Sequence, residues 1–328
     1  MGALVDRFRA VLLASAIGDA LGSPVEGLSK MQIARIFGKI RDFTSSTFLQ
    51  RSAGVCTDDT ELAILTAKSI VERKKLDIED IRQKFCMWFD GKPPSIGATT
   101  ALSLSFACRE KLPLDLYPRL VLKIRGDYSA GNGALMRIHP VALYDVGDQN
   151  MLHDVRIVSM ITHPHSDSVE CCQFLCKFIE HLINGDRDAA IQNSLKEVKL
   201  QPHIKKAIIT APKLSEDQLS TTGYVLHTLQ IALWAFYTTD TLEDAIIKAV
   251  NVGGDTDTYG AVCGAIAGAF YGRSAIPQRW KTVRVFDMGY NEIEELGTML
   301  YNTWVEKTKN SHNADAGSGN NTLTKNPS

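Results

Sequence analysis

The sequence predicts an all-α protein, and two observations support this fold class. Apolar side chains recur at intervals of three and four residues through most of the 328-residue chain, which is the repeat of an amphipathic helix. The alternation of apolar and polar residues that marks a half-buried strand is not evident. Helices are therefore expected over residues 4–21, 61–73, 78–89, 99–109, 155–161, 169–183, 223–237, 242–250 and 290–307.

These helices are expected to form one domain, because no strong linker interrupts residues 1–308. We predict a single compact orthogonal multi-helix domain over that range. From Lys309 onward the composition changes to Asn, Ser, Gly, Thr and Lys, without an aromatic residue. Such a segment buries too little apolar surface to order itself, so residues 309–328 are predicted to be a disordered tail.

Charge and composition exclude several classes of partner. Lys and Arg number 36 against 37 Asp and Glu, so the net charge of −1 gives no reason to expect nucleic acid or an anionic membrane as a partner. The N-terminus lacks the pattern of a signal peptide, and the apolar stretch 260–272 is too short to cross a bilayer. The seven cysteines are an odd number, and most lie among apolar residues, typical of buried free thiols in a reducing compartment. A cytoplasmic monomer is expected.

Two short acidic segments lie about two hundred residues apart. They are Thr57-Asp58-Asp59-Thr60 and Gly253-Gly254-Asp255-Thr256-Asp257-Thr258. Carboxylate and hydroxyl oxygens are the ligands that Mg²⁺ or Mn²⁺ prefers. If the segments meet, each pair of carboxylates about 6 Å apart repels by roughly 3 kcal/mol at an effective dielectric of about 20. Such a cluster needs cations or protons, so the sequence indicates a metal site.

Each acidic segment also has a simpler interpretation as a helix N-cap. Asp58 followed by Glu61 has the form of a cap with a reciprocal acid, and Asp255 or Thr256 could cap the helix that runs through Ala261. A cap needs one side chain, however, and each segment carries two acids. The glycine pair before Asp255 also lets the backbone approach another group closely. These details favour a metal site over simple capping.

The second acidic segment opens a helix with Gly260, Gly264, Gly268 and Gly272 at four-residue spacing. Each interior glycine costs about 1 kcal/mol of helix propensity relative to alanine. A smooth glycine face compensates for this only if another helix packs very close. The first helix presents a similar face, so we expect the two helices to cross in the core with their ends close together, near Asp19 and Glu26. The matching small residues are Ala14, Gly18 and Gly22.

Two further loops have the character of ligand-binding turns. Gly131-Asn132-Gly133 precedes an amphipathic stretch, and its backbone N–H groups are expected to be available to an anion such as phosphate. Gly97-Ala98-Thr99-Thr100 is a similar flexible entry to a helix. His163 and His165 lie two apart with Asp167 beyond. The two histidines could ligate zinc, but we favour an interpretation in which they cap a helix and line a pocket.

Taken in order, these motifs resemble the ADP-ribosylglycohydrolase family over residues 8–305. The resemblance implies an all-α fold around a central cleft with two Mg²⁺ or Mn²⁺ ions. It also implies hydrolysis of the bond between C1 of ADP-ribose and a protein side chain, most often arginine, so the partner would be an ADP-ribosylated protein or a small ADP-ribose conjugate. The metal ligands that it implies are Thr57, Asp58, Asp59, Asp255, Asp257 and Thr258. The substrate-binding residues that it implies are Ser95, Gly97, Gly131, Asn132, Gly133 and His163.

The resemblance further implies that Glu26 and Asp58 assist catalysis. Many members carry an aspartate directly before the Ile-Gly-x-Thr-Thr loop, where this chain has Ser95. Serine cannot act as an acid–base carboxylate, so a non-catalytic ADP-ribose-binding or crystallin-like structural relative is the alternative. A third hypothesis is an all-α metallophosphohydrolase that uses His153-Asp154 with His163 and His165. It leaves both aspartate segments without a role.

Overall fold

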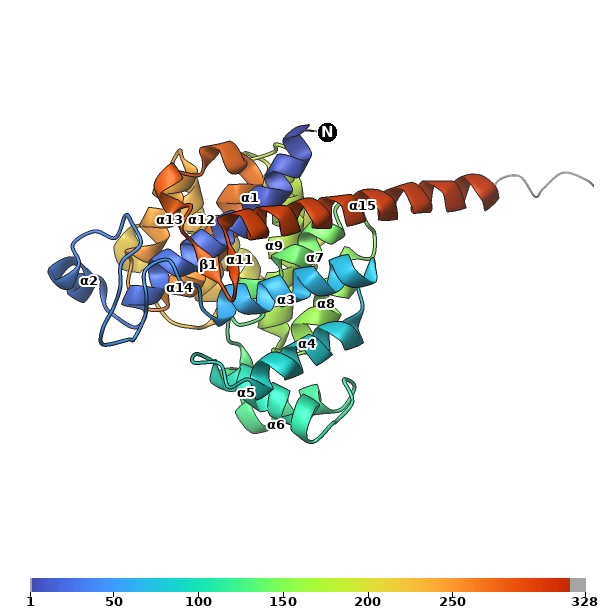
Figure 1. Ribbon diagram of the computed structural model, residues 1–328, viewed down its shortest axis with the longest axis horizontal. Helices are drawn as coiled ribbons and strands as arrows, with labels where there is room; N and C mark the ends of the chain where they lie inside the picture. Colours follow the sequence, from blue (N-terminus) through green and yellow to red (C-terminus); the bar gives the residue numbers. More distant parts are fainter. Residues whose placement is uncertain (1, 319–328) are drawn as a thin grey trace, which may run out of the picture.

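The computed structural model describes residues 2–318, without the side chains of residues 311–318, and its architecture is helical as predicted (Figure 1). One antiparallel hairpin, β1 (Arg284–Val285) with β2 (Met288–Gly289), is the sheet in this part of the chain. The α-helices are α1 (Gly2–Gly22), α2 (Lys30–Ile36), α3 (Asp58–Arg73), α4 (Ile78–Asp90), α5 (Ala98–Leu104), α6 (Tyr117–Arg125), α7 (His139–Tyr144), α8 (Met151–Met160), α9 (Ser166–Ile183), α10 (Ala190–Glu197), α11 (Pro202–Thr210), α12 (Val225–Tyr237), α13 (Leu242–Val250), α14 (Thr256–Tyr271) and α15 (Tyr290–Ser318). The short 3₁₀ segments are Ser23–Val25, Gly126–Ser129, Leu135–Arg137, Ala211–Lys213, Glu216–Gln218, Arg273–Ala275 and Gln278–Trp280, and a π-helical turn spans Ser105–Arg109.

The helices that the sequence pattern missed are short. Helices α2, α6, α7, α10 and α11 have six to nine residues, too few for a repeat to stand out. Three of them, α6, α7 and α11, also begin with a proline in the first turn. Proline is well suited to that position, because the first amides of a helix have no intrahelical acceptor.

Helices α1 and α14 form the centre of the molecule and lie side by side (Figure 1). A Cβ atom placed on Gly18 would lie 1.9 Å from Gly260 O, and one on Gly264 would lie 2.0 Å from Ala14 O. Gly22 meets Thr256 and Gly268 meets Ala10 in the same way. The close approach is confirmed. The helices do not simply cross, however: they run antiparallel and keep one register over more than three turns.

The first helix is the one apolar enough and long enough to span a membrane among the described residues. The segment Gly2–Val25 meets that criterion, rather than residues 260–272. Of its apolar window, 94% is buried inside the fold. Its apolarity is accounted for by its place between α14 and α15, since Gly297 of α15 lies against the backbone of Arg9.

Helix α15 begins at Tyr290, where we predicted it to begin, but it ends later. Near its end, Trp304 Nε1 donates to Val146 O, Glu306 pairs with Lys74 at 3.1 Å, and Lys307 pairs with Asp145 at 2.5 Å. The helical backbone continues to Ser318 and so covers the first part of the segment predicted to be a disordered tail. Residues 319–328 lie outside the described residues, and the domain boundary stays a prediction.

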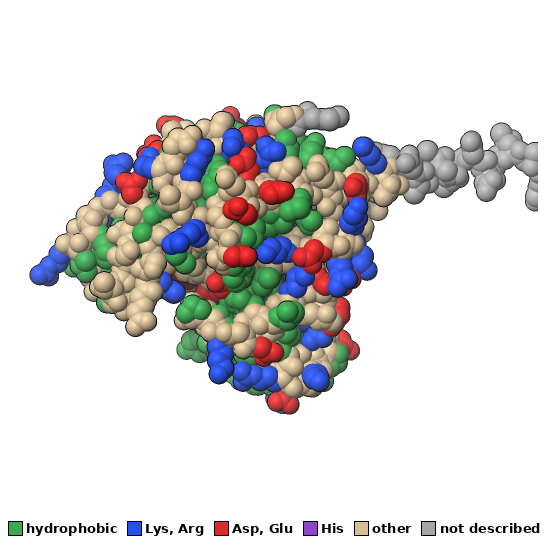
Figure 2. All heavy atoms as spheres, viewed as in Figure 1, with side chains coloured by type: hydrophobic (Ala, Val, Ile, Leu, Met, Phe, Trp, Pro, Cys, Tyr) green, Lys and Arg blue, Asp and Glu red, His purple; other side chains and the backbone are tan. Residues whose placement is uncertain are grey.

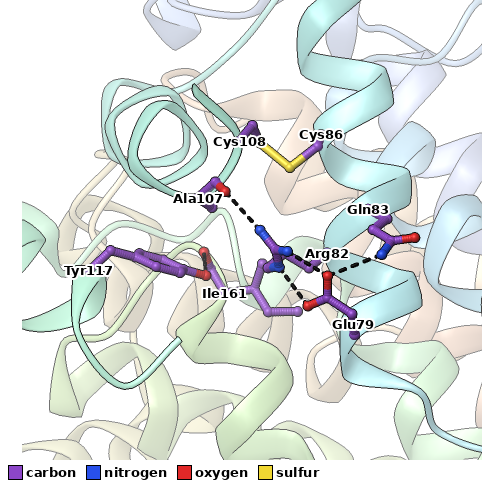
Figure 3. Close-up of a disulfide and its surroundings, with 8 residues drawn as sticks. All are labelled: Glu79, Arg82, Gln83, Cys86, Ala107, Cys108, Tyr117 and Ile161. Carbon is purple, nitrogen blue, oxygen red and sulfur yellow. Dashed lines mark hydrogen bonds and ion pairs between the residues drawn. A yellow bond between two sulfur atoms is a disulfide. The ribbon is translucent and has the colours of Figure 1, made fainter. Parts of the chain in front are cut away.

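Most of the cysteines are buried free thiols, as expected from the sequence, but two are not. Cys86 of α4 and Cys108 of the π-helical turn form a disulfide, while Cys56, Cys171, Cys172, Cys176 and Cys263 are buried free thiols (Figure 3). One turn away on α4, Arg82 donates to Ala107 O at 2.7 Å. Two neighbouring cross-links therefore fasten α4 to the lobe of α5 and α6 in the lower part of Figure 1. Sequence alone could not pair these cysteines, because their contact depends on how α4 packs on that turn.

Candidate active site

One polar pocket of about 340 Å³ collects the motifs described above. It contains twelve of the thirteen residues predicted for the site; Thr57 is the one that does not line it. The roles of these residues stay predictions. The pocket is lined by Glu26, Asp58, Asp59, Ser95, Ile96, Gly97, Ala98, Thr99, Thr100, Arg125, Tyr128, Gly131, Asn132, Gly133, Met136, His163, Gly223, Asp255, Asp257 and Thr258.

The first acidic segment lies at the N-terminus of α3. The N-cap is Thr57 rather than Asp58, which is the first helical residue, so the predicted Asp58 cap is wrong. The Thr57 hydroxyl accepts weakly from the amide of Asp59 at 3.4 Å and donates to Asp19 at 3.0 Å. This arrangement leaves Asp58 and Asp59 in the first turn, where the helix dipole favours negative charge.

Asp19 of α1 holds this helix N-terminus in place. Its carboxylate accepts hydrogen bonds from the amides of Thr57 and Thr60 and from both threonine hydroxyls, at 2.5 to 3.1 Å. The side chain is fully buried, and this burial raises its pKa to about 6 despite those hydrogen bonds. Asp19 thus acts as a cap contributed by another helix, a role that the sequence pattern did not indicate.

The second acidic segment reaches the pocket through a glycine pair in the left-handed conformation. Gly253 and Gly254 have φ values of 84° and 85°, in the left-handed region that favours glycine. A Cβ on Gly253 would lie 2.4 Å from the amide nitrogen of Lys30, and one on Gly254 would lie 2.7 Å from Thr221 O. The predicted need for close backbone approach is therefore confirmed. The turn also pairs with the chain after Glu26, because Gly27 N donates to Gly254 O at 2.7 Å.

Asp255 precedes α14 without capping it by a side-chain hydrogen bond. Its carboxylate instead accepts from Asn132 Nδ2 at 2.7 Å and from the Thr258 hydroxyl at 3.1 Å. Asn132 therefore joins the glycine turn to the acidic segment across the pocket. Its backbone amide donates to Gly223 O at 3.1 Å, so it is not free for an anion, contrary to our expectation for this turn.

Carboxylates converge at the base of the pocket. Glu26, Asp255 and Asp257 each offer an oxygen within 4.8 Å of the other two, the one such group of His, Cys, Asp or Glu found in the described part. Burial raises the pKa of Asp58 to about 7, and burial together with neighbouring carboxylates raises the pKa values of Asp59 and Asp257. The repulsion foreseen from the sequence is thus present.

The donor set fits a hard divalent cation. Asp59 Oδ2 is buried and has no hydrogen-bond partner, which leaves an anionic oxygen without compensation. An unpaired buried charge of this kind is costly unless a cation or a proton neutralises it. Carboxylate oxygens in this number match the ligand preference of Mg²⁺ or Mn²⁺ rather than that of zinc. The arrangement is therefore a possible metal-binding group.

The opposite wall is formed by the glycine turn and His163. A Cβ on Gly133 would lie 2.6 Å from His163 Cε1, and one on Gly131 would lie 3.1 Å from Nε2, so both glycines make room for the ring. Burial, with smaller contributions from nearby arginines, lowers the pKa of His163 to about 3. The ring is consequently neutral at physiological pH.

His165 follows the interpretation that we favoured for this pair. Its Nδ1 accepts from the amide of Asp167 at 3.1 Å and caps α9, while His163 lines the pocket. His153 is exposed on α8 and belongs to no group of clustered ligands in the described part of the chain. The metallophosphohydrolase hypothesis therefore has no site here.

A family model described as ADP-ribosylglycohydrolase matches residues 2–310, which is nearly the whole chain. The chain belongs to the ADP-ribosylglycohydrolase family. It is therefore an ADP-ribosyl hydrolase by family, and the resemblance inferred from the sequence motifs is confirmed.

Relatives of this ADP-ribosylglycohydrolase act in several settings, judging by their names. An ADP-ribosyl-[dinitrogen reductase] glycohydrolase of Rhodospirillum rubrum is 33% identical over 84% of this chain and 89% of its own. An ADP-ribosylarginine hydrolase Tri1 of Serratia proteamaculans is 31% identical over 84% and 74%. An ADP-ribosylhydrolase ARH3 of Xenopus tropicalis is 24% identical over 94% and 98%. A solved structure titled ADP-ribosylglycohydrolase-related protein complex superposes with a TM-score of 0.79, at 29% identity, and covers 93% of this chain and 100% of its own.

The ADP-ribosylglycohydrolase pocket also contains residues that the sequence reasoning missed. Arg125 and Tyr128 lie on its rim, and Tyr128 is 85% exposed. The available signal was their position, because both lie within ten residues before the Gly131 turn. An exposed aromatic residue and a cation beside a glycine-containing turn are typical of a ligand site. Surface side chains, however, carry no periodic pattern that would mark these two residues in the sequence.

Proposed function

We propose that this ADP-ribosylglycohydrolase hydrolyses the bond between C1 of ADP-ribose and a modified protein side chain, most often arginine, and so reverses mono-ADP-ribosylation. The observation that carries the proposal is the convergence of Glu26, Asp255 and Asp257 with the Asp58-Asp59 segment at the base of one pocket. Among the relatives named above, those more than 30% identical carry names of hydrolases of ADP-ribosylated dinitrogen reductase and of ADP-ribosylarginine.

The proposed cofactor is a pair of Mg²⁺ or Mn²⁺ ions. Thr57, Asp58 and Asp59 would hold them from one side, and Asp255, Asp257 and Thr258 from the other. When bound, such ions orient the hydroxyls of a sugar and lower the pKa of a coordinated water or hydroxyl. The uncompensated Asp59 Oδ2 supports this assignment. Thr57 is its least supported member, because its hydroxyl already donates to Asp19.

Two carboxylates of the chain are proposed for the chemical step. Glu26 lies half-buried at the pocket with Arg51 3.4 Å away, and it would take the proton of the water that attacks C1. Asp58 would stabilise, as a carboxylate, the positive charge that develops on the sugar as the bond to the side-chain nitrogen breaks. The departing guanidine then takes up the proton that Glu26 received from the water, so that Glu26 returns to its carboxylate form.

The glycine turn and His163 are proposed to hold the diphosphate of the substrate. Glycine amides lie close to a ligand without adding bulk, and those of Gly131 and Gly133 serve this role in the proposal. Ser95 and Gly97 would contact the sugar from the facing loop. Asn132 would act indirectly, through its hydrogen bond to Asp255.

Ser95 keeps a second candidate function open, that of a non-catalytic ADP-ribose-binding or structural relative. The Ser95 hydroxyl forms a hydrogen bond to Asp58, which partly offsets the rise in the pKa of that carboxyl. A serine at this place supports binding of the sugar and of Asp58, but it supplies no carboxylate. This candidate predicts affinity for ADP-ribose without turnover.

Release of ADP-ribose from ADP-ribosyl-arginine in the presence of Mg²⁺ tests the proposal. We expect turnover by the intact chain and a loss of about 100-fold or more in the Asp257→Asn variant, whose helical content should be unchanged. Asp115→Asn, an exposed acid away from the pocket, is the matched control and should retain activity. Binding of ADP-ribose without any turnover of arginine, serine or acetyl conjugates would favour the non-catalytic candidate. A monomer in the cytoplasm remains our proposal for its state and location.

A further inference from the structure

Arg137 is a fully buried arginine close to the candidate active site that the proposed function does not use. Its guanidinium lies 4.7 Å from the centre of the Phe85 ring, and no ion pair with Asp or Glu links to it in the part of the chain that the structure describes. Burial lowers its pKa to about 10, which still leaves it charged at neutral pH. A buried cation without a carboxylate is costly, so its polar contacts require an explanation.

Arg137 Nη2 donates to Val158 O at 3.3 Å, and its second hydrogen bond leads toward the pocket. Arg137 Nη2 donates to the Thr162 hydroxyl at 2.7 Å, and this hydroxyl lies 2.9 Å from Nδ1 of His163. All three side chains are buried. The guanidinium can only donate hydrogen bonds, so the Thr162 hydroxyl oxygen accepts one from it. The hydroxyl must then donate its own hydrogen to a different acceptor. Nδ1 of His163 is the acceptor found within reach of that hydroxyl among the described residues, and an unplaced buried proton would be costly.

This directional chain fixes the protonation of the His163 ring. If Nδ1 accepts a hydrogen bond from the Thr162 hydroxyl, the neutral ring carries its own hydrogen on Nε2. Nε2 has no protein partner among the described residues, and the ring lines the pocket between Gly131 and Gly133. The Nε2 hydrogen is therefore available to a ligand acceptor.

We propose that Arg137 and Thr162 are positioning residues that lock His163 in the tautomer with hydrogen on Nε2, so that it donates to a phosphate oxygen of the bound nucleotide. The inference deepens the proposed function and rests on it for the identity of the ligand. A diphosphate is the fitting acceptor class, since it is anionic and the pocket wall also carries Arg125. Neither Arg137 nor Thr162 touches the ligand in this proposal.

A matched pair of substitutions at Thr162 tests the relay. Thr162→Val removes the hydroxyl at nearly constant volume, whereas Thr162→Ser keeps it. We expect the affinity for ADP-ribose, measured by calorimetry with Mg²⁺ present, to fall roughly threefold to tenfold in Thr162→Val and to stay within about twofold of the natural chain in Thr162→Ser. In hydrolysis the Thr162→Val substitution should raise KM and leave kcat little changed, because the relay supports binding of the diphosphate and not the bond cleavage at C1.

Nitrogen NMR of the ligand-free protein tests the tautomer separately. Two-bond ¹H–¹⁵N correlations of His163 should show a bare Nδ1 and a protonated Nε2 in the natural chain, and this preference should weaken in Thr162→Val and return in Thr162→Ser. A purely structural role for Thr162 would lower the melting temperature without changing the tautomer. A protonated Nδ1 in the natural chain, or equal affinities in the valine and serine variants, would overturn the inference. If the protein neither binds nor hydrolyses ADP-ribose conjugates, the proposed function fails, while the NMR result still decides the relay.

Discussion

At the scale of single residues, protonation states are set by burial. His139, at the start of α7, is fully buried, and burial lowers its pKa from 6.5 to about 3. A histidine whose pKa is lowered on folding stays neutral in the native state below pH 6.5, where it becomes charged on unfolding. The stability that it contributes is fully present above pH 6.5 and is lost as the pH falls toward 3.

The first prediction concerns acid sensitivity at this residue. Between pH 7 and pH 5 the natural chain should lose about 2 kcal/mol more unfolding free energy than the His139→Gln variant, because glutamine does not titrate. Urea unfolding of both proteins at the two pH values measures the difference. Parallel losses in the two proteins would contradict the assigned burial effect. The pKa of His163 is lowered in a similar way, so the unfolding free energy of the His139→Gln variant should still depend on pH, but less than that of the natural chain.

How far residues could be predicted from the sequence depended on the range of their interactions. Asp58, Asp59, Asp255 and Asp257 were found as local clusters, and the structure brings them to one pocket. The cap formed by Asp19 was missed, because it joins positions 38 and 41 residues apart. The Arg137 relay escaped notice for the same reason. Its hydrogen-bond directions exist only after α8, the glycine turn and the following loop have packed together.

At the scale of elements, the antiparallel pair of α1 and α14 sets the position of the site. Its glycines bring backbone against backbone, so the two helices keep one register over more than three turns. The end of α1 carries Asp19 and leads to Glu26, while the start of α14 carries Asp257. The helix pair was predictable from glycine spacing, but its antiparallel course was not, because spacing alone does not fix the direction of a crossing.

The second prediction tests this contact. Gly264→Ala should lower the unfolding free energy by about 3 kcal/mol or more, since its Cβ would lie 2.0 Å from Ala14 O, and this clash outweighs the gain of about 1 kcal/mol in helix propensity. Gly2→Ala is the matched control on the partner helix, because nothing lies within 4 Å of its added Cβ. Thermal unfolding distinguishes them, and equal melting temperatures would contradict the close packing.

The third prediction concerns the disulfide between α4 and the π-helical turn. Closing a loop of 22 residues restricts the unfolded chain by about 3 kcal/mol in the entropy model, which corresponds to about 5 °C in melting temperature for a chain of this length. The double variant Cys86→Ser/Cys108→Ser should melt lower by this amount. Adding a reductant should lower the natural chain to the same value and leave the double variant unchanged. If reductant left the melting temperature of the natural chain unchanged, the disulfide would make no contribution to stability.

At the scale of the whole molecule, the site lies between parts of the chain that are distant in sequence. The segment after α1 and the N-termini of α3 and α14 supply the acidic base, and the α5–α6 lobe supplies the facing rim with Tyr128 and Arg125. Lys and Arg side chains gather on the lower edge of that lobe (Figure 2). Ligand binding at such a site should stabilise the fold as a unit, because it joins elements from both ends of the chain.

The fourth prediction measures that coupling. Mg²⁺ or Mn²⁺ at about a hundred times its dissociation constant should raise the unfolding free energy of chelator-treated protein by about 2.7 kcal/mol, or roughly 4 °C in melting temperature. The shift should vanish in Asp255→Asn and persist in Asp115→Asn. Sodium chloride at matched ionic strength serves as the control for screening. An equal shift from sodium chloride would show general charge neutralisation instead of a specific ion site.

The glycine seam between α1 and α14 has a consequence for how this protein tolerates change. Contact between the main chains of the two helices sets the distance between Asp19 and Asp257. Substitutions elsewhere leave these main-chain atoms in place. Side chains on the pocket walls are therefore free to diverge while the acidic floor keeps its shape. Ser95 lies on such a wall, and laboratory redesign of substrate preference should begin with the walls and spare the seam.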